Sequence, residues 1–271
     1  MYYGMRAMLA VHVAAAFFAH LGDGARAEAS LTYGGFTSLV YMTGILGGYV
    51  ADRMLGYQRS IMLGGVLMAI GMVLLMAPDL TSFLVGLAVI IVGNGLFKPN
   101  ISTMVGKLYA QGDERRDSGF TLFYMGINLG AMFAPLLTGW MAENMFGGTP
   151  DMPTYKIVFI TSGIGMLISL VWFWFGRRQL GGIGRPLEGD GGKQKVLYVL
   201  LFCLVSVPVY YFLLAIDAAK LQVVLTALFL LLCGMLLMEG IREGQVARDR
   251  AIAMLIIFTF NILFWCFFEQ A

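Results

Sequence analysis

Three ionisable residues lie inside long apolar stretches of this 271-residue sequence: Arg6, Lys98 and Glu269. A lysine at the centre of a bilayer costs roughly 2.5–3.5 kcal/mol on insertion scales, so such residues usually face a water-filled cavity and serve a function. Two cations and one anion leave one positive charge over. This surplus suits the binding of an anionic group on a substrate.

Polar and aromatic residues recur beside these charges at the spacing of one helix face. Residues three or four apart lie on the same side of a helix, as Tyr2 and Tyr3 do with Arg6, and Asn94 with Lys98. The same spacing joins Tyr124 to Asn128, and Asn261 to Trp265 and Glu269. For Asn94, Tyr124 and Asn261 two interpretations stay open: they line a cavity, or they hold helices together by hydrogen bonds.

The elements that must position these residues are membrane helices. Hydrophobic residues make up 59% of the chain and charged residues 13%, against about 25% charged in soluble domains. A spanning helix needs about 20 mostly apolar residues. We therefore predict an all-α polytopic membrane protein rather than a β-barrel, with helices at 2–21, 31–51, 60–77, 82–109, 118–142, 157–176, 196–215, 221–240 and 251–271.

The basic loop residues predict the orientation. Loops on one side hold thirteen lysines and arginines, and loops on the other side hold three, Arg26, Lys156 and Lys220. The first set should face the cytoplasm, which places the protein in the cytoplasmic (inner) membrane. The net charge of +2 gives no reason to expect nucleic acid as a partner. The three cysteines form no metal-binding pattern, and no cofactor is expected.

A glycine-rich basic stretch at 177–195 reads as a cytoplasmic linker. It separates an amino-terminal bundle of six helices (1–176) from a further helix pair (196–240) and a last helix (241–271). Six helices and a linker are the layout of half a major facilitator transporter. Both ends of the sequence lie in apolar runs, so we expect a fragment of a larger transporter.

Two glycine patterns and one loop pattern support this layout. Gly44/Gly48 and Gly126/Gly130 are spaced for close helix contact. The stretch "GGYVADRMLGYQR" carries Asp52, Arg53, Gly56 and Arg59, which match the loop signature G-x-x-x-D-R-x-x-G-x-x-R of major facilitator transporters. His12 lies off the face of Arg6, so we interpret it as a packed core residue rather than a proton relay.

Four stretches in order along the chain resemble motifs of the proton-dependent oligopeptide transporter (POT) family. They are "YYGMR" at 2–6, "GLFKPNIS" at 95–102, "FYMGINLG" at 123–130 and "FWCFFEQ" at 264–270. The resemblance implies a major facilitator fold, of which this chain would hold the first bundle, an inserted helix pair and the first helix of the second bundle. The remaining carboxy-terminal helices of the parent chain would then be partners.

The resemblance also implies roles for individual residues. Tyr2, Tyr3, Tyr41, Asn128 and Trp265 would line a peptide cavity in which Lys98 contacts the peptide carboxylate. Arg6 and Glu269 would form a salt bridge across the extracellular gate, and Glu269 could also pair with Lys98. These three residues would serve proton coupling and the gate. The implied activity is proton-coupled symport of di- and tripeptides across the bilayer by alternating access.

Other functions fit the sequence less well. Another small anion such as nitrate is the alternative substrate, because Arg6 and Lys98 suit any carboxylate-like group. A channel would show pore-loop repeats or rings of like charge, and a membrane enzyme would show a catalytic motif; we find neither in the sequence. Two departures from the family pattern stand out: the E-x-x-E-R half of the first-helix motif is absent, and so are the last five core helices. Gly34 occupies the position of a histidine in animal members.

Overall fold

The computed structural model describes residues 2–145, 154–186, 192–216 and 218–268, and every regular element within these ranges is helical. This confirms the all-α prediction. The helices are α1 (Tyr2–Ala16), η1 (Ala19–Gly24), α2 (Ala25–Val50), the π-helical turn η2 (Ala51–Leu55), α3 (Tyr57–Leu74), α4 (Leu80–Lys107), α5 (Arg115–Asn144), α6 (Tyr155–Gly176), η3 (Arg177–Leu180), α7 (Lys193–Ala215), α8 (Ala218–Glu243) and α9 (Gln245–Phe268).

Six helices in the described part of the chain are long and apolar enough to cross a membrane: α3, α4, α5, α6 together with η3, α7 and α8. The protein is therefore a multi-pass membrane protein. Each of the nine predicted segments contains a helix, but α1 has 15 residues and is shorter than the usual span of about 20. Helix α2 begins at Ala25 and α9 at Gln245, ahead of their apolar cores, because polar residues at the membrane surface can still make helical hydrogen bonds.

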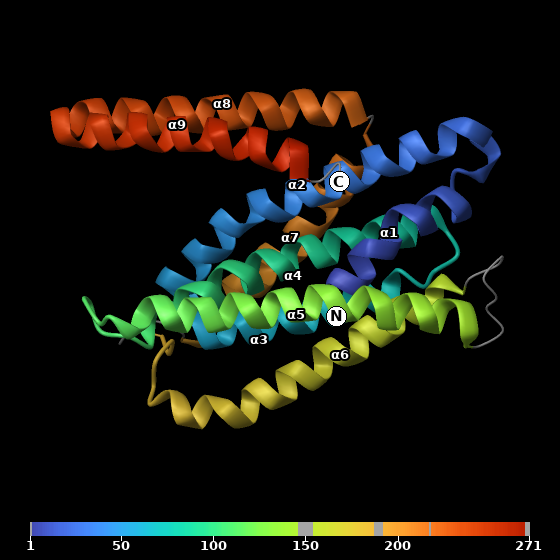
Figure 1. Ribbon diagram of the computed structural model, residues 1–271, viewed down its shortest axis with the longest axis horizontal. Helices are drawn as coiled ribbons and strands as arrows, with labels where there is room; N and C mark the ends of the chain where they lie inside the picture. Colours follow the sequence, from blue (N-terminus) through green and yellow to red (C-terminus); the bar gives the residue numbers. More distant parts are fainter. Residues whose placement is uncertain (1, 146–153, 187–191, 217, 269–271) are drawn as a thin grey trace. The chain divides into compact units, whose positions relative to one another are not determined.

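The chain divides into two compact units, Met1–Ala218 and Ala219–Ala271. In the first unit α4 is the central helix and contacts α2, α3, α5 and α7 (Figure 1). It begins where the Asp79 side chain accepts a hydrogen bond from the Ser82 N–H at 2.8 Å, a standard N-cap. In the second unit α8 and α9 join at Gly244, which has a φ of 112°. The division predicted from the sequence, into a six-helix bundle (1–176), a linker (177–195), a helix pair (196–240) and a last helix (241–271), stays a prediction.

Glycines allow the central helices of the first unit to pack backbone against backbone. A Cβ atom added to Gly64 of α3 would lie 2.5 Å from the Gly93 carbonyl oxygen of α4, and one on Gly93 would lie 2.7 Å from the Gly64 oxygen. Gly71 and Gly86 form a second such pair further along the same two helices. Small residues permit this close approach in membranes, where lipid gives no hydrophobic force between helices.

The glycine pairs singled out in the sequence are not the ones that make these contacts. A Cβ at Gly48, Gly126 or Gly130 would meet no described atom within 4 Å, and one at Gly44 would reach Pro99 only at 3.9 Å. Among the described residues, the prediction of close helix contact is therefore wrong for Gly48, Gly126 and Gly130, while Gly44 lies at ordinary van der Waals distance from α4. Four-residue spacing places two glycines on one face, but it does not say which face meets a neighbour.

Candidate functional site

The α2–α4 crossing at Pro99 fixes the segment that carries Lys98. Proline has no N–H, so the carbonyl of Gly95, four residues earlier, loses its helical hydrogen bond. Gly47 of α2 lies directly against this carbonyl, where any larger residue would overlap it. The Asn100 side chain donates a hydrogen bond to the Gly47 carbonyl at 3.0 Å. The proline thus marks a tight, hydrogen-bonded crossing of two helices.

Lys98 lies against α2 one turn away from this crossing. Its Nζ is 4.3 Å from the centroid of the Tyr41 ring, and the Tyr41 side chain is 54% exposed. A cation over an aromatic face is stabilised by about 0.5–1 kcal/mol at an exposed site. The ring therefore holds the ammonium group without neutralising its charge, which leaves the charge available to an anion.

Arg6 makes the equivalent contact two turns earlier on α2. Its Nε donates a hydrogen bond to the Tyr33 hydroxyl, and its Cζ is 5.4 Å from the Tyr33 ring centroid. Tyr33 and Tyr41 are eight residues apart on one helix face, about 12 Å along the axis. Two cations thus rest on one aromatic stripe of α2. Tyr33 was not among the residues predicted from the sequence, although its spacing from Tyr41 is the signal that identifies it.

Thr37 lies between the two tyrosines on the same face of α2. Its Oγ1 is buried and has no hydrogen-bond partner among the described residues. A buried hydroxyl without a partner is unfavourable, and water or a ligand would satisfy it. The stripe of Tyr33, Thr37 and Tyr41 therefore has the polar character of a cavity wall.

The first two tyrosines lie one turn before Arg6. The rings of Tyr2 and Tyr3 pack edge to face with their centroids 5.9 Å apart. Asn94, four residues before Lys98, is only 4% exposed and lies in the core around α4. Burial favours the structural interpretation for Asn94, while Tyr2 and Tyr3 are half-buried beside the cation that they precede.

Helix α5 carries a separate, mostly apolar hollow of about 620 Å³. Tyr124 and Asn128 line it, and Tyr124 is 54% exposed. Arg6, Lys98 and Tyr41 are not among the described residues of its lining, and the shared peptide cavity of Asn128 with the two cations stays a prediction. The other lining residues are Phe120, Thr121, Met125, Leu129 and Met132.

The predicted partners on the last helix cannot be placed against the cations. Trp265 belongs to α9 of the second unit, and its side chain is outside the described part of the structure. Glu269 lies outside the described residues. The Arg6–Glu269 salt bridge, the Lys98–Glu269 contact and a cavity role for Trp265 remain predictions.

The loop signature forms a compact cluster at the other end of the bundle. The Tyr57 hydroxyl donates a hydrogen bond to the Asp52 carboxylate, and the Lys107 Nζ lies 4.2 Å from the Tyr57 ring centroid. Gly56 has a φ of 75°, a left-handed conformation that favours glycine. The signature residues thus tie the end of α2 to the start of α3 and the end of α4. Arg53 accepts at its carbonyl a hydrogen bond from Lys195 at 3.3 Å.

His12 is a core residue, as interpreted from the sequence. It is 8% exposed, and its ring lies 5.1 Å from that of Phe159 and 5.6 Å from those of Phe83 and Tyr155, measured between centroids. Aromatic neighbours on several sides give it a packing role.

Comparisons with known proteins agree with this architecture. The family model of the POT family matches residues 58–271. A di-/tripeptide transporter of Lactococcus lactis subsp. cremoris is 40% identical over 211 residues, which cover 76% of this chain and 41% of that protein. A dipeptide and tripeptide permease B of Photorhabdus luminescens is 31% identical over 277 residues, which cover 99% of this chain and 53% of that protein. The chain spans about half the length of the curated relatives it matches.

Solved structures show the same fold. A POT peptide transporter crystallised in complex with alafosfalin superposes with a TM-score of 0.75 at 31% identity, covering 99% of this chain and 55% of that one. A bacterial homologue of the human drug peptide transporters PepT1 and PepT2 gives a TM-score of 0.82 at 27% identity, covering 99% and 56%. These similarities assign the chain the fold of the major facilitator transporters. Within that class, the chain belongs to the POT family.

Proposed function

We propose that this chain forms part of a proton-coupled symporter of di- and tripeptides that works by alternating access. The observation that carries the proposal is the pair of cations, Arg6 and Lys98, held on the tyrosine stripe of α2. The names of the relatives, which are di- and tripeptide transporters, support the substrate class. Further carboxy-terminal helices of the parent chain would complete the cavity.

Lys98 would bind the peptide carboxylate. Its ammonium group rests on the Tyr41 ring, an arrangement that orients the group and still leaves its N–H donors for a carboxylate. Hydrogen bonds between charged partners are about twice as strong as neutral ones. Tyr2, Tyr3, Tyr41, Asn128 and Trp265 would contact the rest of the peptide. The backbone and both charged ends are common to all short peptides, so such a site tolerates many side chains.

Proton coupling would come from an exchange of partners at Glu269. In the empty transporter Glu269 would pair with Arg6 or Lys98, which holds it ionised. When a peptide carboxylate occupies Lys98, the glutamate loses a cationic neighbour, and this favours its protonated form. A protonated Glu269 would release Arg6 and weaken the outer gate. Proton, substrate and conformation would then be linked through one residue.

Uptake into proteoliposomes tests the substrate and the coupling. We expect the complete transporter to accumulate dipeptides when an inward proton gradient is imposed and to ignore nitrate. Peptide accumulation that does not depend on the gradient would refute symport. Nitrate transport without competition by peptides would mean that the substrate is nitrate and not a peptide. The 271-residue chain alone should not transport, because it would lack much of the second bundle; peptide uptake by the purified chain would contradict this.

Glu269→Gln tests the partner exchange separately. Glutamine has nearly the same shape but cannot change its charge. We expect the variant transporter to exchange labelled for unlabelled peptide between equal pools and to lose accumulation driven by a pH gradient. Counterflow and pH-driven uptake measured in the same vesicles make the comparison. If the variant still concentrates peptide, coupling depends on another group.

A further inference from the structure

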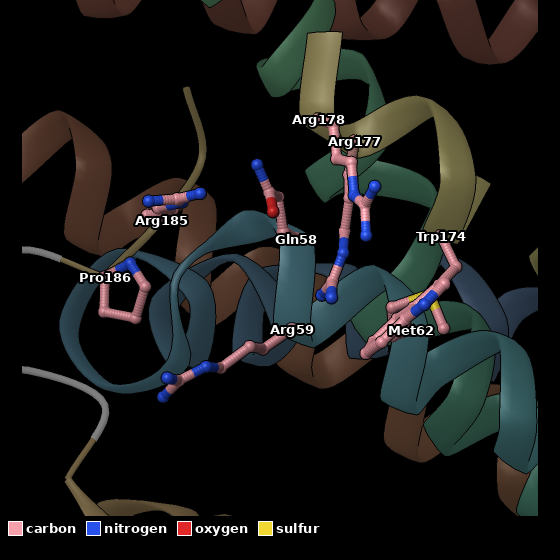
Figure 2. Close-up of a pocket in the computed structure, with 8 residues that line it drawn as sticks. All are labelled: Gln58, Arg59, Met62, Trp174, Arg177, Arg178, Arg185 and Pro186. Carbon is pink, nitrogen blue, oxygen red and sulfur yellow. The ribbon is translucent and has the colours of Figure 1, made fainter. Parts of the chain in front are cut away.

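A second pocket, of about 610 Å³, lies where the start of α3 meets the end of α6. Figure 2 shows Arg185 and Pro186 on one side of it, and Arg177, Arg178 and Trp174 on the other, with Gln58 between them. Arg59 and Met62 complete the lining. Four of these eight residues are arginines, on the face that the basic loops predict to be cytoplasmic.

The linker after α6 is docked on the bundle, and this docking builds the pocket. The Gln58 N–H donates to the Gly184 carbonyl at 3.0 Å, and its side-chain Nε2 donates to the Ile183 carbonyl at 2.6 Å. Leu180 and Ile183 pack against the buried cluster around Tyr57 and Met104. Arginines from three separate segments are therefore held around one hollow by buried contacts and are not merely spread along a basic loop.

The close approach of the linker depends on Gly56. A Cβ atom at this position would lie 2.5 Å from the Pro186 nitrogen and 2.8 Å from the Arg185 carbonyl carbon. The glycine of the loop signature thus serves the seating of residues 184–186 as well as the turn between α2 and α3. One wall of the arginine pocket is consequently part of the same rigid end of the bundle as the signature itself.

The chemistry of the lining indicates a phosphate. None of the described lining residues is acidic. Guanidinium groups present planar pairs of N–H donors that match phosphate oxygens, which is why arginine dominates phosphate recognition. Arg177 stacks on Trp174, with its Cζ 3.2 Å from the ring centroid. This stacking orients the guanidinium group through its face, while the N–H donors point outward in the plane of the group.

The outer face of α6 indicates that the phosphate belongs to a lipid. Ile168, Val171 and Phe175 follow one another at three- and four-residue spacing and are 63%, 56% and 71% exposed. Arg178 follows Phe175 by three residues, at the end of this apolar stripe. Trp174 is 48% exposed beside it, and tryptophan is enriched at the level of lipid headgroups. We propose that the pocket binds the phosphate headgroup of an anionic membrane phospholipid whose acyl chains lie along α6.

Native mass spectrometry and thermal unfolding of the purified 271-residue chain test the proposal. The probes are phosphatidylglycerol, zwitterionic phosphatidylcholine and inorganic phosphate. The pocket variant is R177Q/R178Q/R185Q, and the matched control is R242Q/R248Q/R250Q, which removes three arginines from the second unit. We expect phosphatidylglycerol to bind and to raise Tm, and to bind at least about tenfold more weakly to the pocket variant, while the control stays within about twofold of the unchanged chain.

Several outcomes would overturn the lipid site. Equal losses of phosphatidylglycerol binding in both triple variants would mean general electrostatic attraction. Equal binding of phosphatidylcholine would mean that the arginines do not distinguish an anionic from a zwitterionic lipid. Binding of inorganic phosphate with displacement of the lipid would assign the pocket to a free phosphate compound. R177K/R178K/R185K keeps the charge and loses the paired donors, so it should fold and bind at an intermediate level. If it binds like the unchanged chain, the guanidinium geometry has no role.

Discussion

Helices α4 and α5 have similar sequence features but very different surroundings. Both carry four glycines, an internal proline and an asparagine one turn from a second polar or charged residue. Within an apolar stretch of 18 residues in each helix, 72% is buried in α4 and only 6% in α5. The glycines of α4 touch the backbones of α2 and α3. A Cβ atom added to Gly126 or Gly130 of α5 would have no described atom within 4 Å.

This difference separates packing from site formation. On α4 the buried side of the helix positions Lys98, because Gly95, Pro99 and Asn100 fix its crossing with α2. On α5 the polar residues Tyr124 and Asn128 line an open hollow, which favours the cavity interpretation for them. An asparagine one turn from a second polar residue thus belongs to the packed core on α4, whereas on α5 it lines a hollow.

The largest effect should come from adding one methyl group to α4. In Gly93→Ala the new Cβ would lie 2.7 Å from the Gly64 oxygen and 2.8 Å from the Met68 nitrogen. Because backbone atoms cannot move aside, we expect a loss of about 3 kcal/mol, the upper end of usual overpacking costs. Gly130→Ala on α5 is the matched control and should be neutral or slightly stabilising. Thermal unfolding in detergent measures both; equal losses would remove the contrast between the helices.

Removing the charge of Lys98 should abolish function and leave the fold. We expect Lys98→Ala in the complete transporter to lose proton-driven peptide uptake, because the carboxylate loses its cation. The cation–π interaction with Tyr41, which this substitution also removes, contributes only about 0.5–1 kcal/mol to stability. Lys107→Ala removes an interaction of similar geometry from the same helix, 4.2 Å over Tyr57 instead of 4.3 Å over Tyr41. The two variants should have similar Tm values, and normal uptake by Lys98→Ala would show that the lysine only holds helices together.

The sequence predicted the helices well because membrane helices need long apolar runs, and the motifs around Lys98 and Asp52 predicted the family. It did not predict which glycines make contacts: Gly93 meets Gly64 and Gly47 meets Gly95, and such pairings depend on how the helices rotate against each other. Tyr33 was missed for a related reason. Its spacing from Tyr41 places both rings on one face of α2, but its contact with Arg6 of α1 cannot be predicted from the pattern of α2 alone. The docking of the linker through Gln58 was equally invisible in the sequence.

The two asparagines should respond in opposite ways. Asn94 of α4 is 4% exposed, so Asn94→Ala should lower stability by about 0.5–3 kcal/mol, because truncating a buried side chain leaves a cavity, with little change in peptide affinity. Asn128 of α5 faces the hollow, so Asn128→Ala should leave Tm unchanged and raise the KM for peptide several-fold. Unfolding and uptake measured on both variants decide between the roles. A Tm loss confined to Asn128→Ala would reverse the assignment.

The smallest effect should come from the turn that connects α4 to α5. The Asp113 carboxylate accepts hydrogen bonds from Arg115, at 2.9 Å from its backbone N, 3.1 Å from Nε and 2.8 Å from Nη2. These bonds lower the pKa of Asp113 from 3.8 to about 2. A lowered pKa means that the folded state favours the carboxylate, so its contribution is complete above the ordinary pKa and is lost as the pH falls through about 2. The Arg115 side chain is 83% exposed, and exposed pairs contribute little. We therefore expect Asp113→Asn to lower Tm slightly at pH 7 and by progressively less between pH 4 and pH 2, when both proteins are unfolded thermally across this range. A Tm difference that stays constant down to pH 2 would mean that the turn depends on the shape of Asp113 and not on its charge.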